Sequence, residues 1–284
     1  MRRDLHLRNF SGGLSLVSGC AIDDVIDDGR ADDAGFAARD QVVLLGLVGD
    51  DAPVVRLVVD EPLTADEDAA WLARVRRRLD VPDGRVLLVG GFDPDDLAGW
   101  RDGEEPMGGV EVVAVPPGRW DVDLYTHVGS MNGRELLERP AASGRGRRAK
   151  ARPLGTWFRA SHPGAPLPAW LAHHLELDGT LDPEHEDAWG DVAAAVGDGR
   201  LAIDLAHRSF VGFLIHLTPA IEDRALDEVG DDGWIDPAAG ARPLATCPRG
   251  LPSTADDPEL AASVRRWAGE AEPDAPADDD VDDE

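Results

Sequence analysis

One stretch of the chain carries ionisable side chains at every second position. Its members are Asp121, Asp123, Tyr125 and His127. Carboxylates and an imidazole in one row can transfer protons as general acids and bases when burial shifts their pKa values. The same alternation is typical of a strand with one buried and one solvated face, so an ordinary solvated face is the favoured interpretation.

A second group of residues has the chemistry of metal ligands. His162, His173 and His185 lie near several acidic residues in the sequence, and imidazole with carboxylate suits zinc or non-haem iron. Neighbouring His173 and His174 on a helix would point about 100° apart, and the H-E-x-x-H pattern is missing. Surface histidines are therefore the favoured interpretation, and we expect neither a metal nor another cofactor.

Motifs for nucleotide binding and for serine hydrolysis are missing. The sequence contains no G-x-x-x-x-G-K-[ST] loop, no G-x-G-x-x-G turn and no G-x-S-x-G elbow. It does contain a basic segment without any acid, residues 139–152, with Arg145, Arg147, Arg148 and Lys150. These four cations are candidate partner-binding residues, for an anionic partner or for the acidic tail. A plain flexible linker or loop is the favoured interpretation.

The charge balance favours some partners and disfavours others. The chain has 28 basic and 56 acidic residues, a formal net charge of −28. Such a field repels nucleic acid phosphates and anionic lipids, so we expect a basic protein partner, no nucleic acid and no membrane. The apolar runs are too short to span a bilayer and the first residues lack a secretory signal, which predicts a cytoplasmic protein. A salt-adapted cytoplasm or a GC-rich genome would also explain the composition.

Local signals predict two helices clearly. Thr64 and Glu67 form a capping box, and apolar residues at helical spacing follow it, which predicts a helix over about 65–79. Asp257 followed by Pro258 is typical of a helix start, and Gly269 marks the expected end.

The strands are predicted in pairs. Residues 41–48 with 54–59, and 110–115 with 120–128, are apolar runs separated by turn residues, as in β-hairpins. Because such pairs outnumber strand–helix–strand units, we expect an α+β fold with largely antiparallel sheets and packed helices.

The composition predicts four regions along the chain. Residues 1–138 form a β-rich half with one helix, 139–152 a basic flexible linker or loop, 153–269 an α+β half, and 270–284 a disordered acidic tail.

Three stretches together resemble known proteins. They are 115–120 (VPPGRW) continuing to 125–133 (YTHVGSMNG), then 155–158 (GTWF) and 210–219 (FVGFLIHLTP). Over most of its length the chain resembles uncharacterised bacterial cytosolic proteins of unknown function. The resemblance implies a bacterial housekeeping or conflict-associated role, and it brings no catalytic residue with it.

Two functional hypotheses follow from these observations. The first is an acidic, non-enzymatic protein-binding module, of inhibitor or immunity type, that meets a basic partner through complementary charge. The alternative is a hydrolase, metal-dependent or not, that uses the His and Asp groups named above.

Overall fold

The structure is a computed structural model that describes residues 1–8, 12–28, 33–49, 52–106, 108–138, 153–177 and 192–270. Several predicted features lie outside these ranges, namely the basic positions Arg145, Arg147, Arg148 and Lys150, the candidate ligand His185, and the tail after residue 270. What the sequence predicts for them stays a prediction. Within the described ranges no helix is long and apolar enough to cross a membrane.

Five strands form the first sheet, in the spatial order β1-β4-β11-β8-β5. Their bounds are β1 Arg2–His6, β4 Val54–Val59, β5 Ala73–Val81, β8 Gly118–Thr126 and β11 Val211–Pro219. Neighbours are antiparallel except for β11 and β4, which run parallel. The central strand β11 therefore comes from a part of the chain far from its neighbours in sequence.

Five further strands form the second sheet, in the order β12-β3-β2-β6-β7. Their bounds are β2 Gly13–Ser18, β3 Val42–Gly46, β6 Arg85–Val89, β7 Val110–Ala114 and β12 Trp234–Ile235. Only β12 and β3 run parallel in this sheet. The two-residue β12 is an edge strand that closes the sheet beside β3.

The two sheets pack face to face over the main hydrophobic core. Alternate residues of each strand point inward, for example Leu14 and Leu16 from the second sheet and Val122, Leu124 and Ile215 from the first. All five are at most 2% exposed. The inward alternation along 120–128 that the sequence predicts is therefore present in β8.

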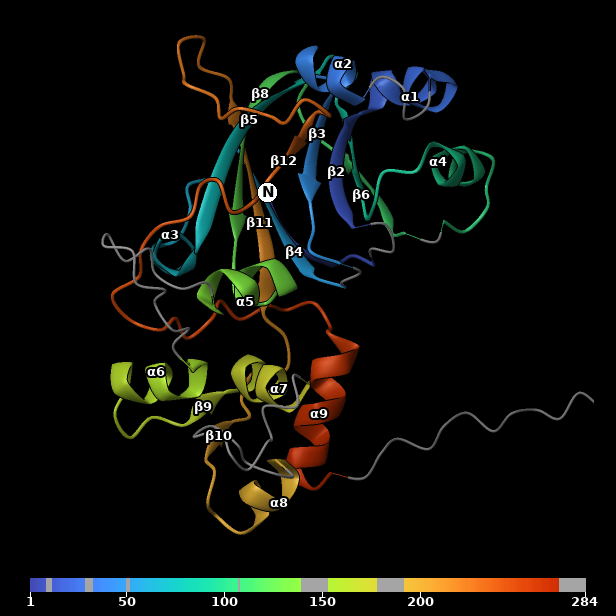
Figure 1. The fold of residues 1–284 in the computed structure, drawn as a ribbon. Coiled ribbons are helices and arrows are strands. Elements are labelled where there is room, and N and C mark those ends of the chain that lie inside the picture. The colour runs from blue at the N-terminus through green and yellow to red at the C-terminus, as the bar shows by residue number, and fades with distance from the viewer. Residues whose placement is uncertain are drawn as a thin grey trace, which may run out of the picture.

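Helices cover the outer face of the second sheet and one end of the sandwich (Figure 1). Over the second sheet lie the 3-10 turn Gly19–Ala21, α1 Ile22–Asp28, α2 Asp33–Ala38 and α4 Pro94–Arg101. At the end of the sandwich lie α5 Met131–Glu138, α6 Leu154–Ser161, α7 Ala169–Leu177, α8 Val192–Gly197, α9 Pro258–Ala268 and the short strands β9 Leu167–Pro168 and β10 Ile203–Asp204. This end layer has its own apolar core around Phe158, Trp170 and Trp267.

The predicted fold class is confirmed. The chain has mixed α and β structure, with largely antiparallel sheets packed against helices. Helix α9 begins after the cap Asp257, whose side chain accepts from the Leu260 N–H, and it ends at Gly269 in the left-handed conformation with φ 68°.

The helix predicted over about 65–79 is wrong beyond its first two turns. The capping box of Thr64 and Glu67 is present, but α3 spans only Ala65–Ala70, and β5 begins at Ala73. Val75 and Leu79 are four residues apart, which suits both a helix and a strand. Pairing with β8 along the whole of β5 decides in favour of the strand.

Both predicted hairpins are wrong as pairs, although the strands themselves exist. Strands β3 and β4 belong to different sheets, and so do β7 and β8. Each turn carries the chain from one sheet across to the other. The hydrogen-bonding partners are then supplied by strands distant in sequence, such as β11 for both β4 and β8.

Candidate functional site

The predicted proton-transfer residues begin on the outer face of β8. Asp121 and Asp123 point away from the core, and the register places them beside Arg78 and Arg76 of β5. Arg78 contacts Asp121 at 3.1 Å, and Arg76 contacts Asp123 at 2.6 Å. The sequence does not indicate these partners, because both arginines fall within the helix that local signals predict over about 65–79.

A third arginine, Arg224, contacts both carboxylates. Arg224 approaches Asp121 at 3.3 Å through Nη1 and Asp123 at 3.1 Å through Nη2. Asp121 is 0% exposed and Asp123 is 2% exposed, so the solvated face predicted for this strand is wrong. We call these five residues, Arg76, Arg78, Asp121, Asp123 and Arg224, the ion-pair row. Charge-assisted bonds from guanidinium groups take the place of hydration there.

The covering segment is residues 220–236, which we call the acidic strap. Its backbone is tied to the sheet: the Ile221 N–H donates to Asp121 at 3.2 Å, and the Ile221 carbonyl accepts from Arg78 at 2.7 Å. Further along, an oxygen of Asp227 accepts from the backbone N–H of Arg76 at 2.6 Å. In Figure 1 the strap begins as the orange loop beside β5 and β8 and reaches β12, which lies beside β3.

The other two predicted residues, Tyr125 and His127, lie away from the strap. Tyr125 is 5% exposed and its ring packs 5.9 Å from that of Trp71. Burial raises the pKa of Tyr125, and the charge of Asp123 adds to the effect, so the phenol keeps its proton.

His127 is 0% exposed, and the backbone of Ala70 lies against its ring. Burial, assisted by the charge of Arg56, lowers the pKa of His127 to about 3. The imidazole is therefore neutral at physiological pH and sealed from solvent.

A second buried charge cluster joins β1, β4 and α3. Arg56 binds Asp4 at 2.6 Å and Glu67 at 3.3 Å, and both carboxylates are at most 4% exposed. Burial alone would raise the pKa of Asp4, but hydrogen bonds from Arg56, the Thr254 N–H and Ser253 lower it to about 2. The sequence offers no signal for this cluster beyond the capping role of Glu67, because the partners are far apart along the chain.

Two of the histidines predicted as candidate metal ligands, His162 and His173, have hydrogen-bond partners within the chain. Nε2 of His162 lies 2.7 Å from the Cys247 carbonyl, and Nδ1 of His173 lies 3.1 Å from the Ser263 hydroxyl. Burial lowers the pKa of His173 to about 4. Across the described ranges no three His, Cys, Asp or Glu side chains come together as a metal-binding group. His185 lies outside those ranges, so the full predicted set is not placed.

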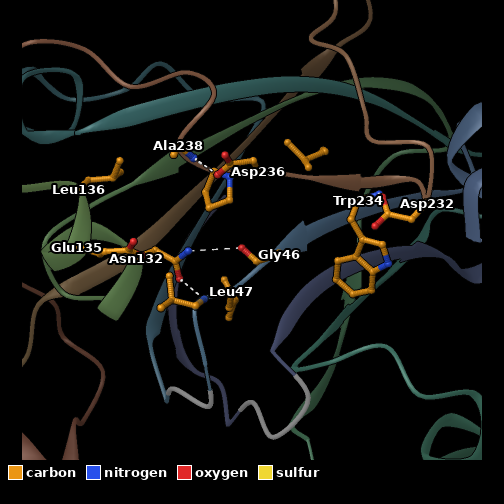
Figure 2. Close-up of a pocket in the computed structure, with 12 residues that line it drawn as sticks. Gly46, Leu47, Asn132, Glu135, Leu136, Asp232, Trp234, Asp236 and Ala238 are labelled. Atoms are coloured by element: carbon orange, nitrogen blue, oxygen red, sulfur yellow. Dashed lines mark hydrogen bonds between the residues drawn. The ribbon is translucent and has the colours of Figure 1, made fainter. Parts of the chain in front are cut away.

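A pocket of about 380 Å³ opens where the end of β3, helix α5 and the end of the acidic strap meet (Figure 2). Asn132 of α5 bridges to β3, since its Nδ2 donates to the Gly46 carbonyl and its Oδ1 accepts from the Val48 N–H, both at 3.4 Å. The acidic residues Glu135, Asp232 and Asp236 are among those that line it. No motif in the sequence indicates this pocket.

Comparison with known proteins finds no matching family model and no matching curated protein. Similar solved structures include one described as "Crocagin biosynthetic gene J", at 13% identity and TM-score 0.40, covering 78% of this chain and 98% of that one. Another is ComJ from Bacillus subtilis, described as an inhibitor of the DNA-degrading activity of NucA. Its identity is 11% and its TM-score 0.30, with 46% of this chain and 87% of ComJ covered. TM-scores this low do not support a shared fold or function.

Proposed function

We propose that this chain is a non-enzymatic protein-binding module that recognises a basic partner protein, in the manner of an inhibitor or immunity protein. One observation carries the proposal: the acidic strap exposes all of its acids and turns its only base inward. The exposed acids are Glu222, Asp223, Asp227, Glu228, Asp231, Asp232 and Asp236. The base is Arg224, which is committed to the ion-pair row.

The rest of the molecule strengthens this asymmetry. The chain has twice as many acidic as basic residues, 56 against 28. Arg56, Arg76 and Arg78 form ion pairs with buried carboxylates. The side chains of these arginines are themselves at most 18% exposed. The excess negative charge therefore faces solvent. A surface of this kind accelerates encounter with a positively charged protein and rejects partners of like charge.

The hydrolase hypothesis receives less support from the same geometry. A general acid or base must reach the proton of a substrate. Asp121 and Asp123 lie beneath the strap and each binds two guanidinium groups, while His127 is sealed and neutral. These side chains are arranged as structural ion pairs and core polar groups.

Affinity capture followed by reconstitution tests the proposal. The tagged full chain is used as bait in extract of its own host at moderate salt, and the captured protein is purified and mixed with the bait. We expect a stoichiometric complex with a basic protein, and an association rate that falls steeply as salt is raised.

The matched variant is Asp223→Asn/Glu228→Gln/Asp231→Asn, which neutralises strap acids without touching the ion-pair row. It should fold normally and associate more slowly with the purified partner. Absence of any stoichiometric basic partner, or a complex that forms equally well with this variant, would refute the role of the strap.

A further inference from the structure

The pocket at the end of the acidic strap is lined by apolar and acidic residues together. Leu47, Leu136, Trp234 and Pro237 supply apolar surface, and Val48, which also lines the pocket, is 53% exposed. The volume of about 380 Å³ lies within the range of about 300–1,000 Å³ that is usual for pockets that take small ligands. The pocket is therefore large enough for an extended side chain from another molecule.

The charges around the pocket have one sign. Glu135, Asp232 and Asp236 are among the described residues that line it, and no Lys, Arg or His is. Figure 2 shows Asp236 and Glu135 toward the α5 end and Asp232 beside Trp234 at the other. Asp232 and Asp236 each accept a backbone N–H through Oδ1, at 3.0 Å and 2.7 Å. Both carboxylates are thereby held in place at the pocket wall.

We propose that this pocket receives an arginine side chain of the basic partner. The inference rests on the proposed function and deepens it, because it places the contact that anchors the partner. Arginine suits the site for two reasons. Its methylene stem can pack on Leu47 and Pro237, and its weakly hydrated guanidinium can bind a carboxylate through two parallel hydrogen bonds. Arginine is also among the residues that contribute most binding energy in protein interfaces.

A small arginine analogue tests the pocket without the partner. The ¹⁵N-labelled full chain is titrated with N-acetyl-argininamide at about 150 mM salt, and separately with its uncharged isostere N-acetyl-citrullinamide. We expect saturable shifts of the amide signals of Leu47, Val48 and Ala238, with a dissociation constant of about 1–10 mM, for the arginine compound only. Equal shifts with both compounds, or shifts spread evenly over the acidic surface, would overturn the assignment.

Two variants with the same loss of charge separate the pocket from the general field. Asp232→Asn/Asp236→Asn should weaken binding of the analogue about tenfold, as expected for the loss of a charge-assisted hydrogen bond. Asp223→Asn/Glu228→Gln removes two charges from the strap outside the pocket lining and should leave binding within about twofold. Equal weakening by both variants would mean that the field, and not the pocket, attracts the cation.

The basic segment of the chain itself is the competing occupant. A variant in which Arg145, Arg147, Arg148 and Lys150 are replaced by Gln decides between the two. If the analogue binds only to that variant, the pocket belongs to the chain's own segment and the proposal is wrong. A partner that still binds the Asp232→Asn/Asp236→Asn variant with unchanged affinity overturns the pocket assignment alone. Failure to find a basic partner overturns the proposed function, whatever the analogue does.

Discussion

Replacing Asp121 by Asn should unfold the protein at a markedly lower denaturant concentration. The asparagine keeps the shape of the side chain but removes a charge that is 0% exposed and that accepts from Arg78, Arg224 and the Ile221 N–H. Removing one partner from a buried ion pair costs about 3–5 kcal/mol, since the remaining charge is left without compensation. Arg224 is 25% exposed and can recover part of its hydration, so we expect about 3 kcal/mol.

Urea unfolding followed by circular dichroism measures this loss of free energy. In thermal unfolding, Tm should fall by about 6–12 °C. The matched control is Glu222→Gln on the strap, whose side chain is 83% exposed and 3.7 Å from Arg119, and which should leave the midpoint unchanged.

A double variant adds a second test. Asp121→Asn combined with Arg78→Met removes both partners of one pair and should lose less stability than the two single variants added together. A loss below about 1 kcal/mol for Asp121→Asn, or strict additivity in the double variant, would show that the ion-pair row is not the buried, coupled network described above.

Three further perturbations follow from the structure. Because the pKa of Asp4 is lowered to about 2, its carboxylate stabilises the fold above about pH 4 and loses that effect as the pH falls toward 2. In urea titrations at pH 6 the free energy of unfolding of Asp4→Asn should therefore be about 2 kcal/mol below that of the wild type. This difference should narrow between about pH 4 and pH 2. Gly133→Ala should cost about 2 kcal/mol or more by the same measurement, because the added methyl group collides with the His127 carbonyl, whereas Gly197→Ala, with open space around it, should cost nothing. Asp257→Ala removes the cap of α9 and should lower the free energy of unfolding by about 1 kcal/mol, with a wild-type midpoint contradicting the capping role.

Features that depend on a few consecutive residues were predictable. The capping box at Thr64 and the start and end of α9 are examples, because the hydrogen bonds that define them join residues no more than a few positions apart. The inward alternation along β8 is equally local, since it follows from the pleat of a single strand.

The partners of the candidate site were not predictable in this way. Arg224 lies 103 residues from Asp121 in sequence, and Asp4 lies 52 residues from Arg56. Nothing near Asp121 indicates that another segment will cover it. The alternation could show that the aspartate side chains point away from the core. It could not show whether water or arginine surrounds them.

The sequence by itself determined the class of fold, the helix caps, the strands that face the core and the acidic excess, because each depends on composition or on short-range geometry. Only the tertiary structure decided which strands pair, that 73–81 is a strand, that the Asp121 face is buried, and that an acid-lined pocket forms beside the strap. The physical reason is that strand pairing and buried ion pairs gain their free energy from contacts between distant segments. Such contacts override local preference where the two conflict.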